Sequence, residues 1–374
     1  MSHRLFFMDN LKWAIIWLMV VFHAAMCYMA YAPEWWYVVD KAEPAFSATV
    51  FICWADIFIM PVMFFISGYF GLQSLARHGA ATFWKKKFLR IFLPWVFGAV
   101  FLAPPITYII LASRHVPMDF WTFYTTLFWG PLYEQAAYWY LGALLALYVL
   151  LQLAVLLCPS LARRTPRRPG ALYFLALFAL SALSIGVISA YMPLDTWKFY
   201  AYLLVLQPVR IPTYILIFFA GAWAYRCHWF EPMGYTPQPV LWSAAAILFS
   251  LLYLWQKFQL PGTFAPDTAR YLNALAQGGF HVSAVFALLA VFRRCLDDTT
   301  PLLSQLSKTS YGVYYLHMLI LFPVAWIFCG ISLPVYPKYF LVCAISLAIC
   351  YLLTKHVLLH IPCFGGGKQR KGVL

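Results

Sequence analysis

The sequence predicts an all-α fold: a polytopic membrane bundle of about ten transmembrane helices, with both termini in the cytoplasm. Composition is the first reason, because 64% of the 374 residues are hydrophobic and 10% are charged, with a mean hydropathy of +0.76. These values are typical of integral membrane proteins and exclude a soluble domain of this length. The second reason is a series of apolar runs, each long enough to cross the roughly 30 Å hydrocarbon core. The third is that basic residues gather in the short loops between these runs.

Ten apolar segments of about 20 residues each are predicted to be transmembrane helices, with limits set by breaker residues. The predicted spans are residues 11–31, 48–72, 89–112, 138–158, 171–191, 203–225, 238–256, 271–293, 309–329 and 338–360. The aromatic segment 119–133 is predicted to lie at the membrane interface as a re-entrant or surface piece. No period of roughly 20–50 residues recurs along the chain. Residues 1–374 are therefore predicted to form a single transmembrane domain.

The placement of charge predicts the orientation. With the amino terminus inside, 19 Lys and Arg residues face the cytoplasm and 7 face the other side, which accounts for all 26. Cytoplasmic loops carry such an excess, so we expect an integral, multi-pass protein of the plasma (inner) membrane, in contact with the lipid bilayer. The net charge of +14 is thus a topology signal, and no nucleic-acid partner is expected. The nine cysteines lack CxxC or CxxxC spacing, so neither a disulfide framework nor a metal site is expected.

The first span carries ionisable residues inside its apolar run. Asp9 and Lys12 stand at its start, and His23 lies in its middle. A helical rise of roughly 1.5 Å per residue places His23 about 16 Å from Lys12, near the bilayer midplane. Eleven residues are close to three turns, so Lys12 and His23 share a face and Asp9 falls near it. Ionisable groups at this depth are costly and indicate function. The alternative is a polar residue satisfied by a neighbouring helix.

A basic cluster lies where the chain enters the third predicted span. Lys85, Lys86, Lys87 and Arg90 place four cations within six positions, which suits a polyanion that arrives from the cytoplasm. Lys87 and Arg90 are three residues apart, so both should project from one side of a helix. Lys85 and Lys86 equally fit a plain positive-inside anchor. Arg90 lies within the apolar register, where a topology signal does not need a cation.

Several stretches of the chain resemble, in order and spacing, the motifs of the acyltransferase-3 family of membrane acyltransferases. That family typically shows an Asp-x-x-Arg start, a later His in the same helix, a Ser-Gly-Phe/Tyr turn and an Arg-x-x-Arg-Ile entry to the third helix. The matching stretches are Asp9-Asn10-Leu11-Lys12 with His23, Phe65-Ile66-Ser67-Gly68-Tyr69, Lys87-Phe88-Leu89-Arg90-Ile91, Trp139-Tyr140-Leu141, Phe219-Ala220-Gly221 and Tyr311-Gly312-Val313-Tyr314-Tyr315-Leu316-His317. The resemblance covers nearly the whole chain.

The chain departs from the family pattern at two positions. Lys12 and Lys87 stand where the family more usually has arginine. Lysine keeps the charge but loses the planar, bidentate fork. If those arginines clamp a phosphate or carboxylate at two points, this chain binds its donor differently or more weakly. We also expect no appended esterase-like domain, so that helices and outer loops alone would bind the acceptor.

The resemblance implies an O-acyltransferase that moves an acyl group, commonly acetyl or succinyl, from cytoplasmic acyl-CoA to a hydroxyl of an extracytoplasmic glycan or glycolipid. Acyl-CoA is the donor substrate, and no metal is expected. Coenzyme A carries several phosphates, so Lys85, Lys86, Lys87 and Arg90 are the predicted donor-binding residues. A carbohydrate or glycolipid is the predicted partner on the outer side.

This chemistry assigns roles to the polar residues in the spans. An acceptor hydroxyl needs a base as it attacks a thioester, and His23 is predicted to be that base. Asp9 or Lys12 would orient the site or support it electrostatically. Ser67, Tyr69 or a cation are candidates to bind the oxyanion. The small-residue turn that contains Ser67 also fits simple packing between helices.

Other polar residues inside spans have two interpretations each. Asp56 shares a face with Ser67 and either contacts the acceptor or pairs with a cation such as Arg210. His281 follows a polar Gln-Gly-Gly notch and is interpreted as a satisfied core histidine in preference to a catalytic one. His317 is expected to support the site, with structural packing as its alternative.

A proton-coupled transporter or flippase is the alternative function, because such carriers also use intramembrane His, Asp and Arg groups. Carriers often show inverted repeats and paired broken helices, and the sequence has no two matching halves. Membrane-bound O-acyltransferases with a buried His would share the chemistry on another fold, which the motif order does not favour. A purely structural scaffold leaves the internal charges unexplained. Oligomeric state, acceptor and acyl chain are left open, and direct transfer is favoured over an acyl-enzyme.

Overall fold

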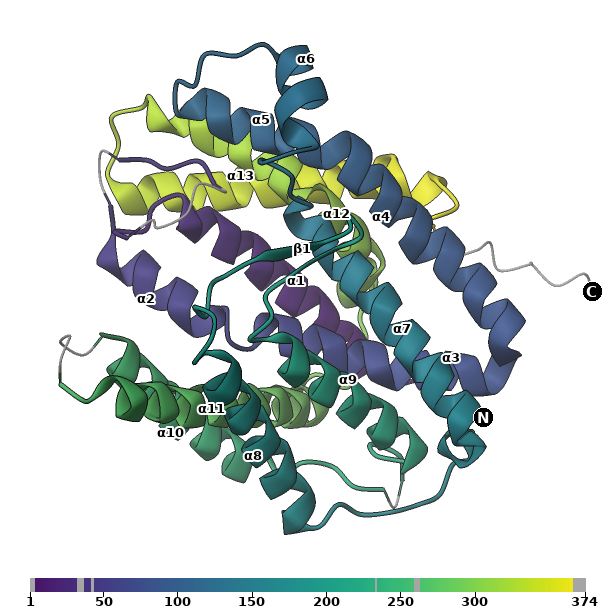
Figure 1. Cartoon of the computed structure of the whole chain (residues 1–374). Helices are drawn as coiled ribbons and strands as arrows, with labels where there is room; N and C mark the ends of the chain where they lie inside the picture. The colour runs from purple at the N-terminus through teal and green to yellow at the C-terminus, as the bar shows by residue number, and fades with distance from the viewer. Residues whose placement is uncertain (1–3, 32–36, 42–43, 233, 259–262, 366–374) are drawn as a thin grey trace, which may run out of the picture. The chain divides into compact units, whose positions relative to one another are not determined.

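The structure is a computed structural model, and it describes residues 4–31, 37–41, 44–232, 234–258 and 263–365. These residues are predominantly helical, which confirms the predicted all-α class (Figure 1). The chain divides into two compact units. The first unit comprises Met1–Ile15, Cys53–Trp84 and Ala143–Thr300, and the second comprises Ile16–Ile52, Lys85–Gly142 and Pro301–Leu374. Helix α1 begins in the first unit and ends in the second.

Helices follow one another along the whole of the described chain. In order they are α1 (Phe6–Met26), α2 (Phe46–Ala55), α3 (Ile59–Lys87), α4 (Leu93–Phe97), α5 (Ala103–Ser113), α6 (Phe120–Thr122), α7 (Trp139–Leu157), α8 (Ala171–Ile188), α9 (Ile211–Arg226), α10 (Pro239–Phe258), α11 (Pro266–Cys295), α12 (Pro301–Cys329) and α13 (Val335–His356). π-Helical turns occupy Phe88–Phe92, Gly98–Leu102 and Phe123–Phe128, and 3-10 turns occupy Ala136–Tyr138, Pro159–Ala162 and Leu358–His360. Strands β1 (Lys198–Tyr200) and β2 (Leu204–Leu206) form an antiparallel hairpin.

Eight helices among the described residues are long and apolar enough to cross a membrane, so the chain is an integral, multi-pass membrane protein. Ten were predicted, and two features account for the difference. One continuous run over residues 46–113 contains two of the predicted spans. Helix α9 has 16 residues, so it is not counted among these eight, although its length is close to the roughly 17-residue lower limit of a membrane-spanning helix.

Two predicted boundaries are wrong. The span predicted over 203–225 begins too early, because Leu204–Leu206 are β2 and the helix starts at Ile211 with Pro212 in its first turn. Strand and helix cannot be separated by hydropathy in such a short apolar run. The second predicted span was ended at residue 72, whereas α3 continues to Lys87 through a kink at Gly79 (φ 71°, ψ 168°). Glycine is the residue that adopts this positive φ without strain.

In the first unit, α11 packs against both α8 and α10 (Figure 1). Two successive glycines allow this double contact. A Cβ on Gly278 would lie 2.8 Å from the backbone nitrogen of Ala182 in α8, and one on Gly279 would lie 2.3 Å from the ring of Phe249 in α10. The predicted polar notch before His281 is therefore also a close-packing site for helices, as small residues commonly provide in membranes.

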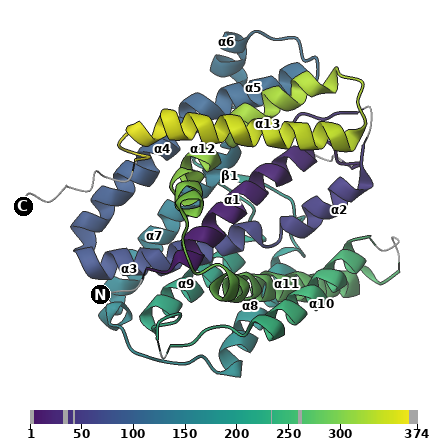
Figure 2. The ribbon, with the colours of Figure 1, turned by 180° about the vertical axis from the view of Figure 1, so that it is seen from behind.

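In the second unit, α12 packs along α13 (Figure 2). Gly312 permits the contact, because a Cβ there would lie 2.3 Å from the side chain of Thr354. At the start of α13, Lys338 Nζ donates to Asp40 Oδ2 at 2.7 Å, and these two side chains are only 2% and 3% exposed. A buried charge requires such a partner, so this ion pair fixes residue 40 against α13.

Candidate active site

Two histidines from distant parts of the sequence meet in the second unit. His23 lies in α1 and His317 in α12, and their ring centroids are 4.9 Å apart at an interplanar angle of 62°. His317 is fully buried, whereas His23 is partly exposed. The structure thus brings together the predicted base and the histidine that was predicted to support it.

Backbone contacts determine which nitrogen of each ring carries the proton. His23 Nδ1 lies 2.8 Å from the carbonyl oxygen of Met19, and His317 Nδ1 lies 2.6 Å from that of Tyr314. A carbonyl oxygen only accepts, so each Nδ1 must donate. In a neutral imidazole the other nitrogen then carries the lone pair. Nε2 of His23 is therefore set up to accept a proton.

Aromatic rings on α12 form a continuous face that leads to this pair. Tyr311, Tyr314 and His317 are spaced three residues apart, which places them on one side of the helix. The Tyr311 and Tyr314 rings stack with centroids 6.2 Å apart, and the Tyr314 and His317 centroids are also 6.2 Å apart. The Tyr314 hydroxyl donates to the carbonyl of Ala137 at 2.6 Å, which holds this face in place.

The far end of the aromatic face meets the predicted basic cluster. Pro94 has no N–H to offer the carbonyl of Arg90 four residues earlier, and the Tyr311 hydroxyl donates to that carbonyl at 2.6 Å. The Tyr315 hydroxyl donates to the carbonyl of Pro94 at 2.9 Å. The second unit therefore joins the helix that carries Arg90 to the histidine pair through side chains of α12.

The basic cluster itself lies mostly on the surface. Lys85, Lys86 and Arg90 are exposed, and Lys87 is half-buried. The π-helical turn that begins at Phe88 widens the helix, so Lys87 and Arg90 do not follow the simple three-residue register predicted from the sequence. The Arg90 guanidinium donates through Nη2 to the carbonyl of Gly365 at 2.9 Å.

Asp9 and Lys12 lie in the first unit, on the opening turns of α1. The helix runs unbroken from Phe6 to Met26, which confirms that one helix carries both residues and His23. Asp9 Oδ2 accepts from Arg4 Nη2 at 2.7 Å, and the two side chains are 28% and 65% exposed. The roles predicted for Asp9 and Lys12 stay predictions.

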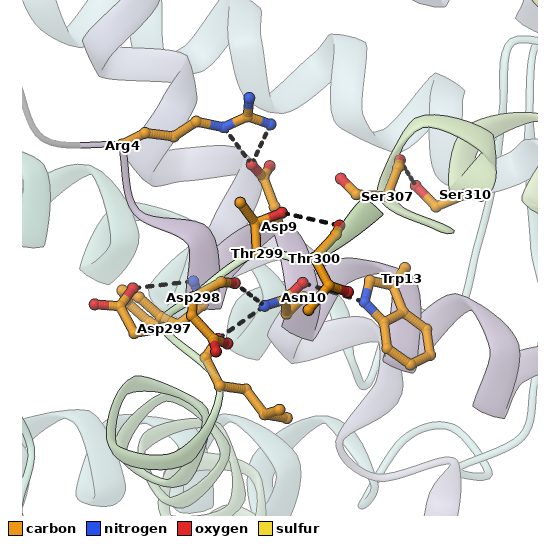
Figure 3. Close-up of polar contacts among 12 residues, drawn as sticks. Arg4, Asp9, Asn10, Trp13, Asp297, Asp298, Thr299, Thr300, Ser307 and Ser310 are labelled. Carbon is orange, nitrogen blue, oxygen red and sulfur yellow. Dashed lines mark hydrogen bonds and ion pairs between the residues drawn. The ribbon is translucent and has the colours of Figure 1, made fainter. Parts of the chain in front are cut away.

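The neighbouring Asn10 ties α1 to the segment that follows α11 (Figure 3). Its side-chain nitrogen donates to the carbonyls of Leu296 at 2.8 Å and Asp298 at 3.0 Å. In return, Asp297 Oδ1 accepts from the backbone N–H of Phe7 at 3.2 Å. Each helix end thus satisfies unpaired backbone groups of the other. This reciprocal capping fixes the start of the helix that carries the predicted base.

Ser67, Gly68 and Tyr69, predicted to form a turn, are helical within α3 in the first unit and pack against α9. A Cβ on Gly68 would lie 1.9 Å from the carbonyl oxygen of Phe218, and one on Gly221 would lie 2.0 Å from that of Phe65. The two glycines thus bring the α3 and α9 backbones into direct contact, which favours the packing interpretation of this turn. The buried Tyr69 hydroxyl donates to the carbonyl of Trp229 at 3.4 Å. Oxyanion binding by Ser67 or Tyr69 stays a prediction.

Replacing Gly68 by alanine is expected to lower the free energy of unfolding by about 1–3 kcal/mol, because the new methyl group must push two backbones apart. Thermal unfolding of the purified protein in detergent measures this effect. Gly170→Ala is the matched control, since nothing lies within 4 Å of a Cβ at Gly170. Equal unfolding temperatures for the two variants would contradict the close α3–α9 crossing.

Asp56 pairs with Arg210 in the first unit, as one of its two interpretations predicted. Arg210 Nη2 donates to Asp56 Oδ2, and the same group lies 3.6 Å from Asp195 Oδ1. Contact between Asp56 and an acceptor stays untested. His281 is buried in α11, but neither of its ring nitrogens has a hydrogen-bond partner among the described residues, so the interpretation as a satisfied core histidine is not confirmed. No three His, Cys, Asp or Glu side chains among the described residues gather as metal ligands would.

Glu134, a buried carboxyl group in the second unit, was not predicted from the sequence to be a functional residue. Glu134 is 1% exposed, and its Oε1 lies 2.6 Å from the Thr107 hydroxyl, which also lies 3.1 Å from the carbonyl of Ala103. Thr107 has one proton for two acceptors, and a protonated Glu134 supplies the second. Burial raises the pKa of Glu134 to about 7, against an opposing effect of the Thr107 hydrogen bond. The only signal in the sequence was an acid at the edge of a predicted span.

This raised pKa predicts that the protein loses stability as pH rises. Above the unfolded pKa of 4.5, the folded state binds one more proton than the unfolded state, so the free energy of unfolding falls until pH passes the folded value. The shift corresponds to about 3 kcal/mol. Thermal unfolding of wild type and Glu134→Gln between pH 5 and about 8 tests this, and the variant should lack that part of the slope. Parallel pH profiles would contradict a neutral Glu134.

Comparison with known proteins identifies the family. A family model described as an acyltransferase domain, acyltransferase-3, matches residues 5–355. Glucans biosynthesis protein C of Salmonella gallinarum is 24% identical over 326 residues, which cover 84% of this chain and 81% of the relative. The Escherichia coli protein of that name is 23% identical over 332 residues, with 84% and 82% covered. No solved structure matches the chain. The chain therefore belongs to the acyltransferase-3 family and is an acyltransferase that transfers groups other than amino-acyl groups.

Proposed function

We propose that the protein is an inner-membrane O-acyltransferase that takes an acyl group from cytoplasmic acyl-CoA and passes it to a hydroxyl of an extracytoplasmic glucan. One observation carries this proposal: the Nε2-basic imidazole of His23 lies against His317, at the end of an aromatic face that starts beside Arg90. The proposed reaction needs a base within the membrane and a basic site that binds the donor phosphates, and His23 and the cluster around Arg90 supply these two parts.

The proposed reaction is a direct transfer. The acceptor hydroxyl oxygen attacks the thioester carbonyl carbon while His23 Nε2 takes the hydroxyl proton. The tetrahedral intermediate then collapses, the carbon–sulfur bond breaks, and the CoA thiolate takes the proton from the imidazolium. His317 packs against His23 and limits its rotation. An acetyl or succinyl group fits this chemistry equally.

The names of the relatives indicate the class of acceptor that we propose. Glucans biosynthesis protein C is named for glucans in both Salmonella and Escherichia coli, and the match covers 84% of this chain. A glucan presents many equivalent hydroxyls, so a general base suffices to activate one. We propose a glucan on the outer side, and cytoplasmic placement of both termini follows from the excess of 19 basic residues over 7.

Mass spectrometry of glucans tests the activity. Cells that express the wild-type chain should carry glucans with an added acyl mass, and cells without it or with His23→Ala should not. The acyl mass also distinguishes acetyl from succinyl. Glucans of identical mass in all three strains would exclude this acceptor, and uptake of substrate without acylation would favour the transporter.

Donor binding predicts a second effect. Arg90→Ala should weaken binding of desulfo-CoA about tenfold or more, because a hydrogen bond between a guanidinium and a phosphate is charge-assisted. Calorimetry on the purified protein measures the affinity. Arg168→Ala removes another exposed arginine and is the matched control, with no change expected. If Arg90→Ala bound desulfo-CoA with unchanged affinity, the donor site would not include Arg90.

A further inference from the structure

The C-terminal segment of the described chain, residues 358–365, lies against Arg90, Tyr311 and Tyr315. After α13 it folds back against α12, within the second unit. The ring of Phe364 stacks on Tyr311, with centroids 5.2 Å apart and an interplanar angle of 29°. The same ring meets Tyr315 edge-on at 4.8 Å. One phenylalanine thus covers the end of the aromatic face that lies beside Arg90.

The next residue, Gly365, accepts a hydrogen bond from Arg90. Gly365 offers its carbonyl oxygen to Arg90 Nη2 at 2.9 Å, and Arg90 is itself held to α12 by the Tyr311 hydroxyl. Phe364 and Gly365 therefore present a flat aromatic ring to a phenol and an adjacent oxygen to a guanidinium. An adenine nucleotide presents the same two groups, a flat ring and phosphate oxygens.

A tight turn gives the segment a defined shape. The backbone N–H groups of Phe364 and Gly365 donate to the carbonyl of Ile361 at 3.0 and 2.8 Å. A Cβ on Gly365 would lie 2.5 Å from the carbonyl oxygen of Leu359, so the turn cannot accommodate a side chain there without shifting. The turn thus holds the Phe364 ring and the Gly365 carbonyl oxygen in a fixed position relative to each other.

We propose that Arg90, Tyr311 and Tyr315 form the subsite for the adenine-nucleotide end of the donor, and that Phe364 and Gly365 compete with the donor for it. This proposal rests on the proposed function, in which acyl-CoA is the donor. A phosphate binds a guanidinium more strongly than a neutral carbonyl does, so the nucleotide displaces the segment. Only molecules whose subsite is free of the segment bind the donor, so the apparent Kd equals the intrinsic Kd divided by the fraction of such molecules.

Binding of desulfo-CoA to the purified full-length protein tests the competition. Phe364→Ala and Gly365→Ala should each tighten the affinity about 3–10-fold, because each weakens the competing segment. Phe340→Ala removes a ring that is 64% exposed on α13, the helix that precedes the segment, and Gly330→Ala adds a Cβ whose nearest neighbour is 3.9 Å away. These two controls should leave the affinity unchanged. Unchanged or weaker binding by the first pair would overturn the proposal.

Thiol labelling gives an independent readout of the segment. Cys363 is free and half-buried beside Phe364, and Cys158 is free and exposed. Saturating desulfo-CoA, which has no thiol of its own, should increase maleimide labelling of Cys363 while labelling of Cys158 stays constant. Unchanged or reduced labelling of Cys363 at saturation would overturn the competition alone. Failure of desulfo-CoA to bind the wild type and every variant would instead reject acyl-CoA as the donor.

Discussion

Replacement of His23 by alanine is expected to abolish acyl transfer while the protein stays folded in the membrane. A general base contributes about 10²–10⁴-fold to a rate, and the exchange removes one partly exposed ring with little loss of packing. The measurement is acyl transfer to glucan per molecule of purified enzyme, alongside thermal unfolding. Turnover within tenfold of the wild type would remove His23 from the mechanism.

Two further variants separate chemistry from folding. His78→Ala removes an exposed histidine and should leave both turnover and unfolding unchanged. His317→Ala removes the buried neighbour of the base and should lower turnover less than His23→Ala does, because the base itself remains. A larger loss with His317→Ala than with His23→Ala would exchange the roles of the two histidines.

Removal of one partner of the Lys338–Asp40 pair is expected to cost about 3–5 kcal/mol of unfolding free energy. Both side chains are almost fully buried, so either single variant, Asp40→Asn or Lys338→Met, removes the ion pair that offsets the cost of burying the charge on the other side chain. Thermal unfolding in detergent measures the loss. The double variant should be more stable than Lys338→Met alone, since it also removes the buried negative charge of Asp40.

The exposed Arg270–Asp267 pair supplies the control. Its side chains are 24% and 76% exposed, and Asp267→Asn should cost less than about 1 kcal/mol because surface pairs are screened by water. Equal destabilisation by Asp40→Asn and Asp267→Asn would contradict the burial of the pair at the start of α13.

The sequence correctly predicted helices whose formation depends on their own residues alone. The continuous apolar run with Asp9, Lys12 and His23 is one helix, because its residues alone determine the helical path in lipid, where backbone groups must pair within the segment. Hydropathy failed where secondary structure depends on neighbours: the apolar Leu204–Leu206 pair with Lys198–Tyr200 instead of starting a helix.

The site was only partly predictable, since its parts come from distant segments. His23 and His317 are separated by 294 positions, and no spacing rule connects α1 to α12. The sequence could name Arg210 as one partner for Asp56, but only the fold selects it. Glu134 was missed because a lone acid beside a span looks like an ordinary loop residue, and its burial against Thr107 is a tertiary property.

The glycine pair between α3 and α9 has a consequence for biogenesis. Gly68 and Gly221 are 153 positions apart, so the face of α3 around Gly68 is synthesised long before the helix that covers it. During translation the insertion machinery or lipid must cover this face until α9 emerges. A chain that stalls before residue 211, where α9 begins, would leave the α3 backbone at Gly68 uncovered and open to cellular quality control.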